Sequence, residues 1–325
     1  MIKSFYSGLL GGSSGSKKGS RLALKAGISI GILAFLLWWL PTEILFKALG
    51  TIPVSVWVIV ILGFIAGHII SAMKWKLLLS AVNVRITATE AVRAHGAGLF
   101  ANLCLPSIVG GDFVRAGVVI KDRGQIEAIA LGSLADRVND TFALVTMAGL
   151  AGLMVPEMAE MKVARILTGM AVFLLVMVTG GMGVILWIPV DRIPGKLAKV
   201  VVRFRDALKS LVRVPHIAFS GFLLSVGIQS GFVGLNVILA DSMGIKAPFI
   251  LWFFAWPLAK IIALVPVSLG GIGVREAALA AIMTPFGIQS ALVVAQSISW
   301  EVVLIISGLC AGLFVTMLPA YKTTK

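Results

Sequence analysis

The chain has 325 residues, of which 59% are hydrophobic and only 13% charged, and its mean hydropathy is +1.03. A soluble domain of this length cannot bury so much apolar surface in one core, so the composition excludes the soluble classes and places the chain in a lipid bilayer. We therefore interpret the net charge of +14 as a reflection of basic loops that face the cytoplasm, and we expect no nucleic-acid partner. Cys104 and Cys310 lie in apolar segments without metal-like spacing, so we expect no disulfide framework, no metal and no cofactor.

Apolar runs of about 18 or more residues predict membrane-spanning helices. Six such runs occur, at 22–40, 54–70 or somewhat beyond, 126–155, 166–188, 217–240 and 291–318. The first run is too long for an ordinary secretory signal and is followed by Pro41 rather than by a cleavage site, so we expect it to be retained. The runs predict an all-α polytopic membrane protein.

The distribution of Lys and Arg predicts which loops face the cytoplasm. Basic residues are concentrated in the tail at 1–21, after the second span, in the segment 192–213 and in the tail at 319–325. We therefore place both tails in the cytoplasm, the first one disordered, and expect a cytoplasmic (inner) membrane location. In this interpretation Lys74 and Lys76 belong to a cytoplasmic basic stretch.

Within 192–213, apolar residues recur at three- and four-residue steps between the basic ones. This pattern is typical of a helix that lies on the membrane surface and is attracted to anionic inner-leaflet lipid. A plain basic inner loop is the alternative, and the sequence supports the two equally.

A ten-residue pattern, P-x3-G-G-x3-R, occurs twice in the chain, 160 residues apart. It comprises Pro106, Gly110, Gly111 and Arg115 in the first copy, and Pro266, Gly270, Gly271 and Arg275 in the second, where Gly273 is a further glycine. Proline ends a helix, and glycine permits turns that are closed to other residues. Each copy follows a short apolar stretch, 91–105 or 249–267, and therefore predicts a re-entrant hairpin. Tight helix packing is the alternative role for these prolines and glycines.

The hairpins divide the membrane region into two halves, 22–155 and 156–318, each with three spans and one hairpin. Because three is odd, the second half must be upside down relative to the first. Six spans with two re-entrant hairpins in an inverted repeat are a transporter architecture, whose binding site lies where the halves meet. A competing interpretation makes 249–267 a full span and loses this symmetry.

Arg115 and Arg275 follow the predicted turns by about one helical turn. A helix that begins inside the membrane has free N–H groups and a positive dipole end, and a guanidinium beside them suits a phosphate. We therefore predict a substrate site at the two arginines, with Asn102, Asp112 and Glu276 as neighbouring polar groups. In the alternative, each arginine is paired with a local acid, Asp112 or Glu276.

Four ionisable residues, Asp136, Arg137, Asp140 and Glu301, lie deep in predicted spans. Such residues are costly in a bilayer and usually face a cavity or one another. They either take up and release protons to drive transport or balance the arginines in a buried network of ion pairs. A shift of 160 residues brings Glu301 next to Asp140, so we expect these two to be counterparts.

Three weaker candidates also lie in the membrane segments. His68 and His95 are interpreted as packing or hydrogen-bonding residues rather than ligands. Gln229 is a candidate cavity-lining group, and Lys260 is placed at membrane depth without a role.

The stretch from Phe100 to Arg115, the Asp136-Arg137 pair and the G-G-I-G-V-R-E sequence ending at Glu276 resemble the flippase-like membrane protein family. That family is named for the transmembrane half of lysylphosphatidylglycerol synthase, and the resemblance covers about 22–318. It implies bacterial or archaeal inner-membrane proteins that move or handle polar lipids, including glycolipids, aminoacyl-phospholipids and hopanoids. The chain departs from the bifunctional synthases because it carries no soluble aminoacyl-transferase domain, so we expect no synthesis of lysyl lipid.

These observations together predict a membrane protein, not an enzyme, that binds and translocates a lipid with a polar or phosphate-bearing head group. The alternative is a membrane-embedded transferase that uses Asp112, Glu276 or Glu301 as a base, or an accessory or scaffold subunit of a lipid, glycolipid or hopanoid pathway. A homo-oligomer or a complex with a lipid-pathway enzyme is compatible with either interpretation.

Overall fold

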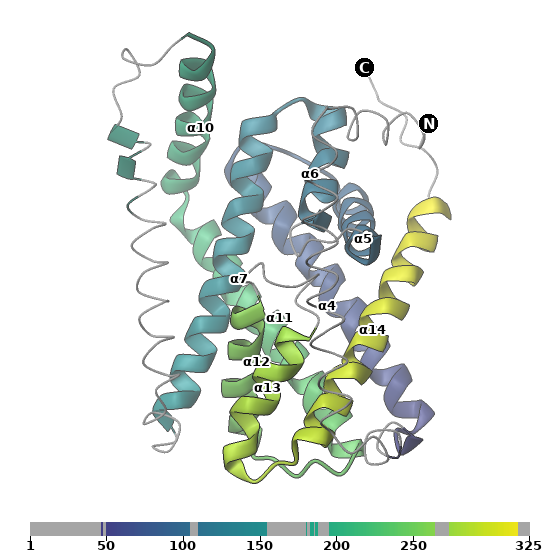
Figure 1. Ribbon diagram of the computed structural model, residues 1–325. Helices are drawn as coiled ribbons and strands as arrows, with labels where there is room; N and C mark the ends of the chain where they lie inside the picture. Colours follow the sequence, from purple (N-terminus) through teal and green to yellow (C-terminus); the bar gives the residue numbers. More distant parts are fainter. Residues whose placement is uncertain are drawn as a thin grey trace, which may run out of the picture.

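The computed structural model of the protein describes residues 50–104, 110–154, 195–263 and 273–317, together with residues 47, 180, 183, 184, 186 and 187. These residues form nine α-helices and one short 3₁₀ helix (Figure 1). The elements are α4 (Val54–Ala81), α5 (Ala88–Cys104), α6 (Gly110–Arg123), α7 (Ile126–Met154), α10 (Gly195–Arg213), α11 (Pro215–Ser242), α12 (Phe249–Ala263), α13 (Val274–Met283), η2 (Thr284–Phe286) and α14 (Ser290–Met317). The all-helical prediction is confirmed for this part of the chain.

Three of the helices, α4, α11 and α14, are each 28 residues long and apolar enough to cross a membrane. They confirm the spans predicted at 54–70, 217–240 and 291–318. Helix α7, with 29 residues, covers the span predicted at 126–155 but carries Asp136, Arg137 and Asp140 near its middle. The span predicted at 22–40 lies outside the described residues, as does most of the one at 166–188.

The outward faces of α4 and α14 are covered with large apolar side chains. Exposed residues include Ile59, Leu62 and Ile69 on α4 and Leu309 and Leu313 on α14. In water so many exposed apolar side chains would favour aggregation, whereas the hydrocarbon core of a bilayer solvates them. These faces therefore mark the surface that contacts lipid.

Two pairs of shorter helices pack within the bundle, α5 against α6 and α12 against α13. In Figure 1 the α5–α6 pair lies in the upper part of the molecule and the α12–α13 pair in the lower part. Helix α12 has 15 residues, which span roughly 22 Å, less than the ~30 Å hydrocarbon core. Residues 105–109 and 264–272, with the predicted turn positions Pro106, Pro266, Gly270 and Gly271, lie outside the described residues.

The buried apolar residues form two clusters. One joins α12 to α4, α11, α13 and α14 around the buried Trp252, Phe254 and Trp256. The other joins the end of α4 to α5, α6, α7 and α10 around Trp75 and Ile129. A polar region that contains most of the buried charged side chains of the described helices lies against both clusters.

Helix α10 occupies the basic segment predicted at 192–213. Its Leu208 and Leu211 are buried in the second cluster, and its Arg203 forms an ion pair with Glu127 of α7 at 3.3 Å. Part of its apolar face therefore covers protein. Contact of the rest with anionic lipid stays a prediction.

Candidate functional site

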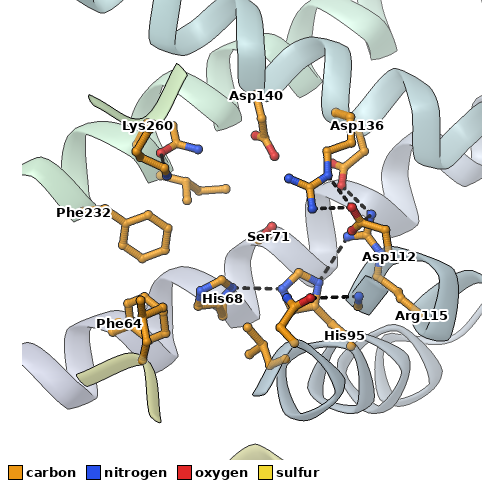
Figure 2. A pocket seen from close by; sticks show the side chains of 18 of the residues that line it. Phe64, His68, Ser71, His95, Asp112, Arg115, Asp136, Asp140, Phe232 and Lys260 are labelled. Carbon is orange, nitrogen blue, oxygen red and sulfur yellow. Dashed lines mark hydrogen bonds and ion pairs between the residues drawn. The ribbon is translucent and has the colours of Figure 1, made fainter. Parts of the chain in front are cut away.

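The polar region surrounds a cavity of about 220 Å³ that is lined by α4, α5, α6, α7, α11, α12, α13 and α14. Seven of its lining side chains are charged, namely Asp112, Arg115, Asp136, Arg137, Asp140, Lys260 and Arg275. Figure 2 shows that the side chains on opposite walls come from helices far apart in the chain. Ionisable groups at this depth are costly unless they are paired or solvated, so the way in which they are paired decides what the cavity can bind.

The start of α6 is held tightly against α5. The Gly111 N–H donates to the Asn102 side-chain oxygen at 2.8 Å, so Asn102 satisfies an amide that helix geometry would leave free. A Cβ on Gly111 would collide with the Gly98 carbonyl oxygen, and one on Gly98 would lie 2.7 Å from the Gly111 carbonyl oxygen. The second glycine of the first motif copy is therefore required for this close approach. Gly110 is buried beside it.

Arg115 is almost fully buried and is engaged on several sides. Its guanidinium donates to Asp136 at 2.9 Å, lies 3.3 Å from Asp112 and contacts His95 at 3.3 Å. The same group lies over the ring of Trp75, 4.6 Å from its centre. Only its Nε is buried without a partner among the described residues. Arg115 therefore holds α6 to α7 and has little capacity left for a ligand.

Lys74 was predicted to lie in a cytoplasmic basic stretch, and this prediction is wrong. Helix α4 continues to Ala81, and Lys74 is fully buried inside the bundle. Its ammonium group forms ion pairs with Asp136 at 3.0 Å and with Asp140, and it donates to Ser225 at 2.8 Å. Asp136 and Asp140, four residues apart on α7, thus share one cation.

Arg137 lies at the edge of the same cluster. It forms an ion pair and a hydrogen bond with Asp112 of α6, and 41% of its side chain is exposed. Asp112 is therefore shared between Arg115 and Arg137, as the alternative interpretation of local acid pairing expected. Of the paired cations around the cavity, Arg137 is the most accessible.

Arg275 forms a second, simpler cluster. It donates to Glu276 at 2.8 Å and to Glu301 of α14 at 2.6 Å, and it lies over Trp256, 5.4 Å from the ring centre. Glu276 also accepts the Gly273 N–H at 2.6 Å. Gly273 has a φ of 83°, a left-handed conformation that favours glycine. Some of the N–H groups that were predicted to be free at the helix starts are thus hydrogen-bonded within the protein, that of Gly273 to Glu276 and that of Gly111 to Asn102.

The two clusters correspond to each other through Asp136 rather than Asp140. In each, the arginine of the motif binds a carboxylate on the next long helix, Asp136 of α7 for Arg115 and Glu301 of α14 for Arg275. Asp140 instead binds Lys74. By these contacts Asp136 takes the place of Glu301, and the expected relation of Glu301 to Asp140 in a repeat stays a prediction.

Lys260 of α12 differs from all these cations. Its ammonium group donates to Gln229 of α11 at 2.9 Å and lies 5.9 Å from the centre of the Phe232 ring. Among the residues that the structure describes, it has no carboxylate within ion-pair distance. In Figure 2 it faces the cavity opposite Arg115 and Asp112. Sequence reasoning placed Lys260 at membrane depth but did not identify it as a site residue.

His68 of α4 and His95 of α5 share a hydrogen bond of 3.0 Å on the cavity wall (Figure 2). His68 also packs edge-on against Phe64, with 4.4 Å between ring centres. The prediction that both histidines are hydrogen-bonding or packing residues is confirmed. Since His95 also contacts Arg115, the pair is tied to the charged cluster.

This architecture of long apolar helices around a charged internal cavity defines a polytopic helical membrane protein. Residues 23–312 match the family described as Lysylphosphatidylglycerol synthase TM region. The chain belongs to this family, and it is a multi-pass membrane protein. It is also 21% identical to the UPF0104 membrane protein PH1989 of Pyrococcus horikoshii over 295 residues, which cover 82% of this chain and 88% of that protein. No solved structure matches the chain.

Proposed function

We propose that this protein binds a lipid with an anionic, phosphate-bearing head group in the central cavity and translocates it across the cytoplasmic membrane. One observation carries the proposal, namely that of the four cations lining the cavity among the described residues, Lys260 is the one without a carboxylate at ion-pair distance. A partly buried cation without a carboxylate partner is stabilised when an anion from outside the protein joins it. The cavity is therefore suited to an anionic guest.

The balance of charges supports this assignment. The cavity region contains five cations and five carboxylates among the described residues: Lys74, Arg115, Arg137, Lys260 and Arg275, and Asp112, Asp136, Asp140, Glu276 and Glu301. Four of the cations are held by these carboxylates, and Lys260 is held by a neutral amide. An incoming phosphate would meet an available ammonium group at Lys260 and the partly exposed guanidinium of Arg137. The role of primary ligand, predicted for Arg115 and Arg275, thus passes to Lys260.

The arrangement of the helix pairs supports movement as well as binding. In this proposal α5–α6 and α12–α13 are the two re-entrant hairpins of an inverted repeat, and their clusters hold each hairpin to the following span. The equivalent bonds of Arg115 with Asp136 and of Arg275 with Glu301 are what such a repeat requires. Binding sites in inverted repeats lie between the halves near the midplane, where rocking of one half exposes them to either side.

The near-neutral cavity would help the head group to pass. A site with many unpaired cations would bind phosphate so strongly that release would be slow, whereas one ammonium group offers binding that can be reversed. The acyl tails of the lipid would stay in the hydrocarbon of the bilayer, and only its head group would cross the polar interior of the protein. In this proposal the N-terminal and C-terminal segments of the chain both face the cytoplasm.

The test uses proteoliposomes of phosphatidylcholine that contain fluorescent phosphatidylglycerol, with leaflet exchange followed by chemical quenching of the outer leaflet. Lys260→Met keeps the side-chain length and removes the charge, so we expect binding of phosphatidylglycerol to weaken by about 10- to 100-fold, in the range for a lost charge-assisted hydrogen bond. Exchange should fall with it. Lys246→Met is the matched control, because Lys246 is an exposed lysine paired with Asp241.

Two outcomes would contradict the proposal. Exchange and binding that are unchanged in Lys260→Met would remove the cavity cation from the function. Chemical turnover of the lipid by wild-type protein, without exchange between leaflets, would instead favour the transferase alternative. Mass spectrometry of co-purifying lipid would identify the head group.

A further inference from the structure

A second cavity, of about 360 Å³, lies between α4, α5 and α14. Its lining is mostly aliphatic and aromatic, with Ile65, Ile69 and Ala72 from α4, Val92 from α5 and Phe314 from α14. We call it the lateral groove. Its α14 wall also includes Cys310, whose thiol is free and exposed.

The lateral groove adjoins the polar cavity. Phe64, His68, His95 and Leu99 line both of them. The hydrogen bond between His68 and His95 (Figure 2) therefore lies on the wall that the polar cavity shares with the apolar lateral groove. His95 reaches Arg115 on the polar side. The two cavities are thus adjacent, one charged and one apolar.

We propose that the lateral groove holds a hydrocarbon tail of the lipid whose head group lies in the polar cavity, so that the lipid enters sideways between α4 and α14. This inference rests on the proposed function. The groove is flanked by Ile69 and Leu309, which are exposed on the lipid-facing surface. A lipid reaching the polar cavity from the bilayer would thus keep its tail in hydrocarbon throughout.

The shared boundary argues for an amphiphile rather than for two independent guests. A free phosphate would need only the polar cavity, and a purely apolar molecule would need only the groove. The guest expected here has a charged end near Lys260 and an apolar end near Cys310, with the imidazoles of His68 and His95 at its junction. A protein helix from a second copy would fill the groove without using the polar cavity.

The experiment blocks the groove after folding, so that misfolding does not confuse the result. In a Cys104→Ser background, Cys310 is the only thiol, and an apolar benzyl maleimide attached to it would occupy the groove. Binding is then measured for phosphatidylglycerol with two 16-carbon tails and for water-soluble dihexanoyl phosphatidylglycerol. A matched control carries the same label on Leu313→Cys in a chain with both natural cysteines replaced by serine, because Leu313 is exposed on the same helix but does not line the groove.

We expect the label on Cys310 to weaken binding of the long-chain lipid by at least about ten-fold and to leave the short-chain lipid within about two-fold, because only the long tail needs the groove. The control label should change neither affinity. Lys260→Met should weaken binding of both lipids.

Several outcomes would overturn the inference. If labelled Cys310 leaves long-chain binding unchanged while Lys260→Met weakens it, the tail lies elsewhere and the head-group site survives. Equal losses for both lipids, or a Cys310 that does not react with the maleimide because protein covers it, would also reject the groove. If neither lipid binds and Lys260→Met has no effect, the proposed function itself has failed.

Discussion

The first and second halves of the chain each contain an ion pair between an arginine and a carboxylate, but the two pairs differ in how many other charged groups they contact. In the first half, Arg115 and Asp136 lie in a network with Lys74, Asp112 and Arg137, in which every charge except Arg137 has more than one partner. In the second half, Arg275 lies between two glutamates, and nearby Lys260 has only an amide. The comparison indicates that the network around Arg115 is more extensively cross-linked than the one around Arg275, which in our proposal leaves Lys260 as the charge that meets the ligand.

The largest expected effect comes from breaking the first network at its centre. Asp136→Asn would leave Lys74 and Arg115 buried with one carboxylate partner fewer each, which typically costs about 3–5 kcal/mol of stability. Thermal unfolding in detergent measures this loss. Asp241→Asn, in an exposed pair, is the control and should change stability by less than about 1 kcal/mol. An equal effect of both substitutions would mean that the network is not structural.

The backbone contact between α5 and α6 offers the next test. Gly111→Ala would force a methyl group against the Gly98 carbonyl oxygen, and such overpacking costs about 1–3 kcal/mol. Gly117→Ala on the same helix meets nothing within 4 Å and should instead stabilise by about 0.5–1 kcal/mol through helix propensity. Opposite signs of the two shifts in melting temperature would support the close approach. A harmless Gly111→Ala would refute it.

Breaking the second cluster should cost less than breaking the first. In Glu301→Gln, Arg275 retains Glu276 and an amide in place of Glu301, so we expect a loss of about 1.5–2 kcal/mol, at the lower end of the range for a hydrogen bond to a charged group. Unfolding of Glu301→Gln and Asp136→Asn under the same conditions compares the halves directly. If Glu301→Gln proves the more damaging, the more extensive cross-linking around Arg115 does not make that network the more stabilising one.

The smallest expected effect on stability is that of Lys260→Met. The substitution removes a cation that has no carboxylate partner, while it leaves the Gln229 oxygen without its donor, so we expect a net change within about 1 kcal/mol. Thermal unfolding of the protein without added lipid measures this change. The combination of near-normal stability with weakened lipid binding would separate Lys260 from the structural charges. A large loss of stability would place it among them.

Sequence reasoning predicted more of the helices than of the charge pairing. Hydropathy over about 20 residues located α4, α11 and α14, because an apolar run of that length is typical of a membrane-spanning helix. The end of α4 was left open beyond residue 70, and Lys74 was misplaced because Lys74 and Lys76 resemble a cytoplasmic stretch. The signal that could have corrected it is the apolar character of the surrounding residues up to Ala81, which continues the helix past both lysines.

The repeated motif predicted that Arg115 and Arg275 are equivalent, and their contacts are alike, because each arginine pairs with a carboxylate on the following long helix. A fixed shift of 160 residues suggested Asp140 as the counterpart of Glu301, whereas by these contacts Asp136 takes the place of Glu301. The arginine and its partner are 21 residues apart in the first case and 26 in the second, so a fixed shift along the chain does not identify the partner.

By itself, the sequence determined that this chain lies in a bilayer, where its apolar helices run and that it contains two related motifs, because these properties depend on residues close together in the chain. Only the tertiary structure decided which of the described charges around the cavity neutralise one another, and that Lys260 has no carboxylate partner among them. Lys74 meets Ser225 across 151 positions of sequence, and Arg275 meets Glu301 across 26. Partners at such distances are chosen by the packing of whole helices, so the difference between a structural arginine and an available lysine exists only in the folded protein.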